Sequence, residues 1–489
     1  MKSRRLTVAL AATAALAAVG GGTAAATGVF SSEDATERAV KTALADHHPR
    51  NVIFLLGDGM GTQEITAARY YQGVNSSLNV DRLPLTGFDT TWSVKPAASP
   101  PYLPDYDPDS ASTGTSWATG KKTIDERISQ GPSSAIEVPG RNYKTVLEQA
   151  KRSGKKVGDV STAELTDATP AVLASHISLR GCQGPGDMDD CASEKKDAGG
   201  LGSIAEQEID HKVDVLLGGG RKRFEQTVTG GDYAGQTVVD QAQGQGYRYV
   251  TDATGLDGIE RSRKPVHGLF TTGNMTQEWT GPAATLGKGN AAVACTEGNR
   301  PANEPSLADM TAKAIELLES RKGFFLQVEG ASIDKRDHAA DACGQLGETV
   351  AFDDAVGVAL AYQRENPDTL VVVTADHAHT SQIVSEDAEG DGLPTGYSTN
   401  LLTKDGQTLS LTYGTAGYGS PAELPSQQHT GAVVPVWGKG PGSLAVLGTN
   451  DHTDLFHTLG GLGQSRRSLN VKWSPLGFWT TRTRPRAPS

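Results

Sequence analysis

The sequence predicts an α/β fold in which a central, mostly parallel sheet is sandwiched between helices. Near-continuous apolar runs at 51–56, 324–328 and 369–374 indicate strands that are covered on both faces. Helical periodicity at 306–320 and 348–364 separates these strands, as parallel crossovers require. Carboxylates or histidines follow each run, so we expect a metal site at the carboxyl ends of the strands.

Length and composition favour one large domain. The chain has 489 residues, of which 37% are hydrophobic and 21% charged, and it contains no internal repeat or long linker. We expect an α/β domain over 50–460, with a loop-rich, crown-like insertion at about 385–428. The basic tail at 461–489 is expected to be exposed and unnecessary for chemistry.

The N-terminus resembles an export signal. A basic start precedes an apolar segment at 6–19 and three alanines at 24–26, so residues 1–26 are interpreted as a signal peptide, followed by an N-terminal arm at 27–49. The Ser-Arg-Arg triplet at 3–5 leaves both the general and the twin-arginine routes open. The apolar segment is short for a membrane span, so we expect a secreted, extracellular or periplasm-like protein without a membrane partner.

The charge excludes one class of partner. The formal net charge is −12, and removal of the signal would bring it to −15. An acidic surface argues against nucleic acid as a specific partner. An anionic substrate would therefore need a locally positive site, such as bound metal ions.

Four cysteines in an exported chain suggest two disulfides, for which three pairings are possible. Pairing of nearest neighbours gives Cys182–Cys191 and Cys295–Cys343, which in the loop-entropy account would contribute about 3 and about 4 kcal/mol. A cysteine metal site is the alternative, but the spacings do not fit a structural zinc cluster.

The first candidate site residues follow the strand at 51–56 and a Pro- and Tyr-rich loop. Asp58 lies between glycines, which let a ligand approach its carboxylate, although an ordinary Asx turn would look the same. Ser110 begins a stretch that we interpret as a helix start. It is either the N-cap of that helix or a nucleophile favoured by the helix dipole and a nearby metal.

A second group follows the predicted strand at 156–161. Asp167 and Thr169 offer hard oxygen ligands of the kind that magnesium prefers, just before an expected helix at 171–179. Arg180 could bind two phosphate oxygens through its planar fork. Each of these residues could equally be a capping or surface residue.

The third group follows the later strands. Glu329 ends the strand at 324–328, and Asp334 and His338 are four residues apart, so they share one face of a helix and could bind one metal. A solvated helix face is the alternative. Asp376 and His377 follow the strand at 369–374, His379 could support a ligand, and His429 precedes the apolar run 432–437. The region from 224 to 303 gave no assignment.

Together these residues indicate a hydrolase with several metal ions. Four of the residues expected at this sheet edge are carboxylates, whose repulsion would be severe without cations between them. Imidazoles with carboxylates favour zinc, and oxygen ligands alone favour magnesium.

The chain also resembles the bacterial alkaline phosphatases over about 50–460. The motifs that carry the resemblance are GDGMG (57–61), DSAS (109–112), STAELTDATPA (161–171), QVEGASIDKRDHAA (327–340), VTADHAH (373–379) and QHTG (428–431). The resemblance implies hydrolysis of phosphate monoesters, with broad specificity, through a phosphoserine intermediate. It also implies two zinc ions, one magnesium ion, a homodimer and the two disulfides given above.

The resemblance assigns roles residue by residue. It implies that Asp334, His338 and His429 bind the first zinc. Asp376 and His377 bind the second, and Asp58 bridges to magnesium, which Glu329 and Thr169 also bind. Ser110 is the nucleophile and Arg180 the phosphate clamp. Asp167 and Lys335 orient magnesium waters and phosphate, and the absence of His or Trp at these two positions favours the zinc, zinc, magnesium set.

Two other functions stay open at this point. A phosphodiesterase or sulfatase could use the same kind of scaffold. A secreted phosphate- or metal-binding protein without turnover is the rival from another class, and it would not need the nucleophile Ser110.

Overall fold

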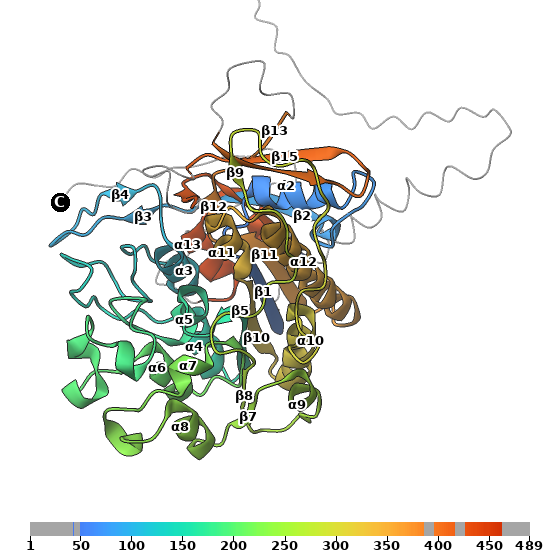
Figure 1. The fold of residues 1–489 in the computed structure, drawn as a ribbon. Helices are drawn as coiled ribbons and strands as arrows, with labels where there is room; N and C mark the ends of the chain where they lie inside the picture. The colour runs from blue at the N-terminus through green and yellow to red at the C-terminus, as the bar shows by residue number, and fades with distance from the viewer. Residues whose placement is uncertain (1–42, 44–48, 386–395, 416–425, 462–489) are drawn as a thin grey trace, which may run out of the picture.

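The computed structural model describes residues 43, 49–385, 396–415 and 426–461, and a ten-stranded sheet forms its centre (Figure 1). Its pairs are parallel except those that β17 makes with β11 and β2, which confirms the expected α/β class. The strands in spatial order are β18 (Gly448–Asp451), β2 (Leu85–Thr90), β17 (Val434–Lys439), β11 (Thr369–Ala375), β1 (Asn51–Gly57), β10 (Phe324–Gly330), β5 (Lys156–Glu164), β6 (Val215–Gly219), β8 (Val266–Leu269) and β7 (Arg248–Val250).

Helices cover both faces of the sheet (Figure 1). One layer contains α2 (Thr62–Tyr71), α9 (Ala253–Asp257), α10 (Leu307–Leu318) and α12 (Ala342–Glu365). The other contains α3 (Ser110–Thr119), α4 (Val146–Arg152), α5 (Ala168–Ala174), α6 (Ile204–Asp210), α7 (Arg221–Phe224), α8 (Val238–Gly244) and α13 (His452–Thr458).

Strand β1 shows why the apolar runs have no polar alternation. Val52, Phe54 and Leu56 join the core under α3, α5 and α13, whereas Ile53 and Leu55 join the core under α10 and α12. Because alternate side chains point to opposite faces of a strand, a sheet covered on both sides needs apolar residues at every position. The central strands are therefore rigidly held, and their carboxyl ends are fixed in space.

A second sheet covers one end of the first. It consists of β13 (Ser381–Val384), β15 (Thr408–Tyr413), β14 (Tyr397–Leu402) and β9 (Thr285–Leu286), in that order. The insertion expected at about 385–428 therefore contains two full strands in its described part. Residues 386–395 and 416–425 of it lie outside the described residues. The unassigned region 224–303 contains α8, β7, α9, β8 and β9.

Short elements complete the described chain. They are β3 (Ser93–Val94), β4 (Pro104–Asp105), α11 (Ser332–His338), β12 (Ala378–His379) and β16 (His429–Thr430). The β12–β16 pair is antiparallel and places His379 opposite His429.

Helix boundaries differ from the expected ones where capping decides them. A capping box of Ser306 and Asp309 begins α10, within the helical stretch predicted at 306–320. Helix α12 begins at Ala342, earlier than 348, because the Asp341 carboxylate accepts a hydrogen bond from Gly344 N at 3.0 Å. The helix expected at 171–179 instead spans Ala168–Ala174 and ends where Ser175 becomes extended.

Both expected disulfides are present. Cys182 pairs with Cys191 and Cys295 with Cys343, so the nearest-neighbour pairing is confirmed and the cysteine metal site is wrong. The second bridge attaches the loop before α10 to the first turn of α12.

The expected terminal segments fall almost entirely outside the described residues. The signal at 1–26, the arm at 27–49 and the tail at 461–489 therefore stay predictions. Within the described ranges, no helix combines the length and the apolar character that a bilayer crossing requires.

Replacement of His267 should make the protein less sensitive to acid. His267 on β8 is fully buried near the Phe224 ring, and burial lowers its pKa to about 3. Its contribution to stability is present above the unfolded pKa of about 6.5 and is lost as the pH falls toward 3. Between pH 7 and 5, the wild type should lose about 2 kcal/mol more unfolding free energy than His267→Leu, as measured by urea denaturation.

The matched control is His457→Leu, which removes an exposed histidine of α13 and should keep the wild-type pH dependence. Equal acid sensitivity in the wild type and His267→Leu would contradict a neutral buried imidazole.

Candidate metal centre and active site

Three neighbouring strands end at the same level and carry carboxylates there. Leu56 of β1 lies opposite Glu329 of β10 on one side and Thr374 of β11 on the other. Asp58 and Asp376 follow directly after their strands. The register of the sheet thus brings three buried carboxylates together, as the sequence pattern predicted.

The turn after β1 requires a glycine. Gly59 has a φ of 68°, and its N–H donates to Asp376 Oδ1 at 2.8 Å. A Cβ at this position would lie 2.6 Å from the His379 ring. The backbone therefore passes between the carboxylates and the imidazole only because residue 59 has no side chain.

Helix α11 carries two of the predicted ligands. Its N-cap residue, Ala331, offers no side-chain cap, but the Thr162 hydroxyl of β5 accepts a hydrogen bond from Ala331 N at 2.9 Å. The helix then places Asp334 and His338 on one face, with His338 Nε2 3.4 Å from Asp334 Oδ1. The predicted four-residue spacing therefore produces a pair that could share one ion.

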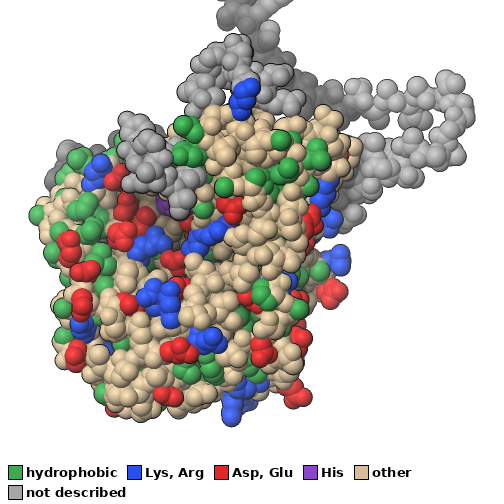
Figure 2. Space-filling model, viewed as in Figure 1, with side chains coloured by type: hydrophobic (Ala, Val, Ile, Leu, Met, Phe, Trp, Pro, Cys, Tyr) green, Lys and Arg blue, Asp and Glu red, His purple; other side chains and the backbone are tan. Residues whose placement is uncertain are grey.

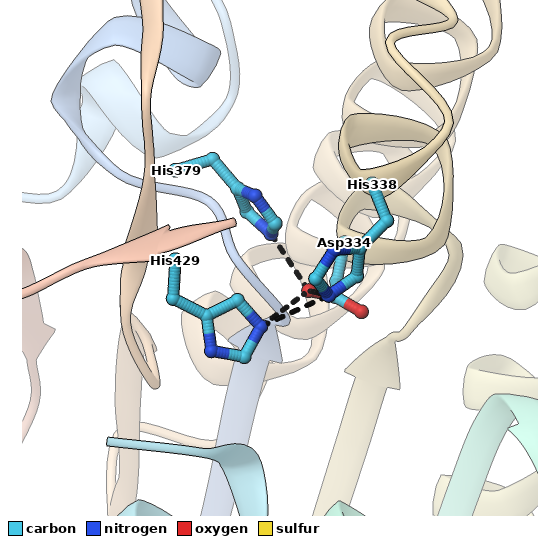
Figure 3. Close-up of side chains that lie close together, drawn as sticks. All are labelled: Asp334, His338, His379 and His429. Carbon is cyan, nitrogen blue, oxygen red and sulfur yellow. Dashed lines mark hydrogen bonds and ion pairs between the residues drawn. The ribbon is translucent and has the colours of Figure 1, made fainter. Parts of the chain in front are cut away.

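Figure 3 shows that His429 from β16 and His379 from β12 complete a cluster around Asp334. His429 Nε2 lies 3.3 Å from Asp334 Oδ1 and 3.0 Å from His338 Nε2. His379 Nε2 lies closer to the carboxylate, at 2.7 Å. The structure thus brings together the residues proposed for the first zinc and the predicted supporting histidine.

The orientation of two imidazoles identifies their free electron pairs. His338 Nδ1 lies 2.7 Å from Gln427 O, and His429 Nδ1 lies 3.1 Å from Pro108 O. Because a carbonyl can only accept, both Nδ1 atoms donate. In the neutral imidazoles, both Nε2 lone pairs then point toward Asp334 Oδ1. These two nitrogens and the carboxylate oxygen are all acceptors, so only a cation or a proton between them can satisfy them.

The distances within this cluster fit zinc. Ligand atoms about 2.05 Å from a tetrahedral ion lie about 3.3 Å from one another. The separations between Asp334 Oδ1, His338 Nε2 and His429 Nε2 lie between 3.0 and 3.4 Å. Burial keeps the pKa of His379 at about 4, so this residue is neutral and donates its Nε2–H to Asp334.

A second cluster lies beside the first and includes the predicted nucleophile. His377 Nε2 is 3.2 Å from Asp376 Oδ2, 3.5 Å from Asp58 Oδ1 and 3.2 Å from Ser110 Oγ. The His377 and His429 rings stack with centroids 3.5 Å apart. The two clusters are therefore neighbours, and Ser110 faces the second of them.

The residues proposed for magnesium have unsatisfied oxygen atoms. Asp58 Oδ1 and Thr169 Oγ1 are buried and lack a hydrogen-bond partner within the described structure. Burial and the nearby Asp376, Asp334 and Glu329 carboxylates raise the pKa of Asp58 well above its usual value. Burial also raises the pKa of Glu329 to about 7, and its carboxylate accepts a hydrogen bond from Ser161.

These observations agree with a cation among the oxygen atoms. A buried oxygen without a partner is costly, and so is each additional carboxylate in a site of low dielectric constant. A divalent ion with hard oxygen ligands removes both costs. The donor set of Asp58, Thr169 and Glu329 therefore fits magnesium.

Ser110 is the first residue of α3 and is not its cap, so the N-cap interpretation was wrong. The cap is Asp109, whose Oδ1 accepts from Ser112 N at 2.9 Å. Because Asp109 satisfies the first turn, the Ser110 hydroxyl is free to face His377 at the positive end of the helix dipole.

Arg180 and Lys335 share one carboxylate. Asp167 Oδ1 accepts from Arg180 Nη2 at 2.9 Å, and Asp167 Oδ2 accepts from Lys335 Nζ at 2.7 Å. Asp109 Oδ2 holds Arg180 Nη1 at 3.2 Å. Burial opposes ionisation of Asp167, but the two cations outweigh it and hold its pKa well below the usual value. Both cations are thus fixed beside Ser110 and the carboxylates.

Sequence reasoning missed the supporting residues Asp109, Ser161 and Gln427. Asp109 had a signal, since Asp is a preferred N-cap and precedes a serine-rich helix start. Gln427 had none, because it orients His338 through its backbone carbonyl, which any residue could offer. Ser161 lies inside a strand, and only the pairing of β5 with β10 places it opposite Glu329.

The surface near this site is strongly charged. Figure 2 shows Asp, Glu, Lys and Arg side chains gathered over the region of α3 and α11, with a histidine visible among them. Mixed charge of this kind suits a polar, anionic ligand better than an apolar one.

Comparisons with known proteins agree with this geometry. The family model described as alkaline phosphatase matches residues 49–420. The alkaline phosphatase of Escherichia coli (strain K12) is 45% identical over 431 residues, 86% of this chain and 87% of that protein. Streptomycin-6-phosphate phosphatase of Streptomyces griseus is 46% identical over 421 residues, which are 84% and 89% of the two chains.

A solved structure shows the same fold. The alkaline phosphatase of Thermus thermophilus superposes with a TM-score of 0.61 at 22% identity. The match covers 86% of this chain and 93% of that one.

The Asp58→Asn substitution should have opposite effects on the metal-free and metal-loaded protein. Without metal, removal of one of several crowded carboxylates should raise the unfolding free energy by about 1–3 kcal/mol. With zinc and magnesium, the variant should gain less stability than the wild type, because it has lost a ligand. Urea denaturation with and without the metals measures both effects.

Asp89→Asn is the control, because Asp89 is also buried but its nearest charges are Asp451, Asp454 and Lys122. It should change the stability of both forms equally. An equal loss in both forms of Asp58→Asn would contradict cation binding at Asp58.

Proposed function

Because this chain belongs to the alkaline phosphatase family and is a phosphate monoester hydrolase, we propose that it transfers the phosphoryl group first to Ser110 and then to water. The observation that carries this proposal is the position of the Ser110 hydroxyl. It lies at the N-terminus of α3, 3.2 Å from His377 Nε2, beside two clusters of ligand-type side chains.

We propose two zinc ions and one magnesium ion as cofactors. Asp334, His338 and His429 would bind the first zinc, and Asp376 and His377 the second. Asp58 would be a ligand of both the second zinc and the magnesium, and Glu329 and Thr169 would complete the protein ligands of the magnesium. When bound, zinc supplies positive charge that lowers the pKa of a hydroxyl group and stabilises the oxygens of an in-line phosphoryl transfer.

The chain's own residues divide the remaining work. The Ser110 Oγ would attack phosphorus in line and form a phosphoserine while the alcohol departs. Attack by water on phosphorus would then break the bond to Oγ and release phosphate. Two successive in-line displacements would retain the configuration at phosphorus.

Arg180 would bind two phosphoryl oxygens through its guanidinium group. Its contacts with Asp109 and Asp167 already hold it beside Ser110, so little side-chain entropy is lost when phosphate binds. Lys335, which the shared Asp167 holds in place, would add positive charge near the phosphate. His379 would orient the Asp334 carboxylate by its 2.7 Å hydrogen bond.

We propose that residues 1–26 direct export and that the mature protein acts outside the cytoplasm. Two disulfides within the described chain support this location, because they form and persist in oxidising compartments. The domain bounds, the homodimer and the lack of nucleic-acid and membrane partners remain part of the proposal. The similarity to a streptomycin-6-phosphate phosphatase supports a broad specificity that extends to esters such as streptomycin 6-phosphate.

Ser110→Ala should lose roughly a thousandfold or more of its turnover of nitrophenyl phosphate. Its zinc and magnesium contents should stay at the wild-type level, because the hydroxyl is not among the proposed ligands. Steady-state kinetics and elemental analysis of the same preparations measure both quantities. Full activity in the variant would rule out Ser110 as the nucleophile, and a higher turnover of a nitrophenyl phosphodiester or sulfate by the wild type would favour the rival hydrolases.

Asp334→Ala and Glu329→Ala should lose different metals. Asp334→Ala should retain about one zinc fewer than the wild type but keep its magnesium, whereas Glu329→Ala should lose magnesium preferentially. Elemental analysis after dialysis distinguishes them, and separate addition of zinc and magnesium to chelated wild type shows which metal restores activity. Loss of the same metal from both variants would contradict two separate sites.

A further inference from the structure

A second group of metal-ligand side chains lies outside the site described above. It consists of Glu148 on α4, His176 just after α5, and His211 at the C-terminal end of α6. His176 Nε2 is 3.4 Å and His211 Nε2 is 3.2 Å from the same oxygen, Glu148 Oε1. The three atoms lie within 4.8 Å of one another. None of these residues belongs to the proposed catalytic centre.

Both imidazoles are oriented as in the cluster around Asp334. His176 Nδ1 lies 3.0 Å from Ser129 O, and His211 Nδ1 lies 2.8 Å from Gln207 O. Since a carbonyl only accepts, both Nδ1 atoms donate. In the neutral rings, the two Nε2 lone pairs are therefore directed at a carboxylate oxygen, which is itself an acceptor.

The carboxylate is also held in place. Glu148 Oε2 accepts from Thr145 N at 2.9 Å in the capping box of α4, so Oε1 is left to face the histidines. The side chains of Glu148 and His211 are 21% and 28% exposed, whereas His176 is only 6% exposed. An ion could thus enter from solvent and find three ligands that are already positioned.

The distances suit a metal ion better than hydrogen bonds alone. Charge-assisted N–H···O⁻ bonds are usually 2.7–2.9 Å long. The two separations here are 3.4 and 3.2 Å, close to the edge of about 3.3 Å expected between tetrahedral zinc ligands. Two histidines and one glutamate form a known zinc ligand set that leaves a fourth position for water.

We propose that Glu148, His176 and His211 bind a divalent transition-metal ion of the zinc type, separate from the catalytic centre. The ion joins α4, the end of α6 and the segment that follows α5. That segment continues to Arg180, whose N–H donates to Glu126 O at 2.8 Å. The site therefore braces the segment that carries the proposed phosphate clamp.

The alternative is a proton in place of the metal. Burial alone would raise the pKa of Glu148, but hydrogen bonds from the two histidines outweigh it and hold this pKa well below its usual value. Burial would likewise lower the pKa of His211, but contact with Glu148 outweighs it and raises this pKa. Both directions correspond to a proton held between the carboxylate and the imidazole, which a bound metal ion would displace. Measurement of the metal content per chain distinguishes a bound metal ion from a proton.

The test compares the metal content of the full-length holoprotein with that of His211→Ala and His211→Gln. After dialysis against trace zinc, the wild type should retain about one zinc per chain more than either variant. Titration of Zn²⁺ into protein depleted at this site should give an affinity at least about 100-fold higher for the wild type than for the variants. His457→Ala, which removes an exposed histidine elsewhere, should match the wild type.

A second measurement does not depend on a variant. Co²⁺ added to wild-type protein whose catalytic centre is already loaded with zinc and magnesium should give the visible absorption of a tetrahedral Co²⁺ site. Equal zinc content in all four proteins, or no such absorption in the wild type, would overturn the proposal and leave a protonated ion-pair cluster. Because the comparison rests on differences between proteins, its failure is distinguishable from failure of the catalytic assignment.

Discussion

The rest of the site depends on one electrostatic constraint: several buried carboxylates meet at the carboxyl edge of the sheet. Burial together with neighbouring charge raises the pKa of Asp58 and brings that of Asp376 to about 6. The strands that carry these carboxylates pack apolar side chains on both faces of the sheet, so the strand ends cannot move apart to separate the carboxylates. Folding therefore concentrates negative charge at this edge. Lys335 and Arg180 neutralise only part of it, because both of them bind Asp167.

Backbone carbonyls decide how the histidines meet this demand. Gln427 O and Pro108 O fix the Nδ1–H atoms of His338 and His429, and so turn the other nitrogen of each ring toward Asp334. Backbone carbonyls likewise orient His176 and His211 toward Glu148 of α4. In all four histidines a backbone carbonyl thus holds one ring nitrogen while the other faces a carboxylate.

Sequence reasoning reached the fold and the cluster of buried carboxylates because both depend on short-range patterns. Asp58, Glu329 and Asp376 were predictable since each ends an apolar run, and parallel strands bring their ends together. Residue roles needed the family resemblance, because a single Ser or Arg carries no distinguishing pattern. Asp109 as the cap of α3 was within reach of capping rules, but the short neighbouring Ser110 was an equally suitable cap.

The remaining features depend on contacts between distant segments. The group of Glu148, His176 and His211 spans three helical segments with no common motif, so neither spacing nor periodicity pointed to it. The strands β14 and β15 were hidden by the Gly-, Thr- and Ser-rich composition around them. Such features appear only once tertiary packing brings the segments together.

The ligands in Figure 3 also set an order of events in the life of the chain. Asp334 and His338 lie on α11, but His429 arrives on β16 about ninety positions later in the chain. The complete cluster therefore cannot exist on a growing chain that does not yet include residue 429. If the proposed ion binds here, its acquisition is coupled to completion of the polypeptide, and a chain truncated before residue 429 lacks one side chain of this cluster.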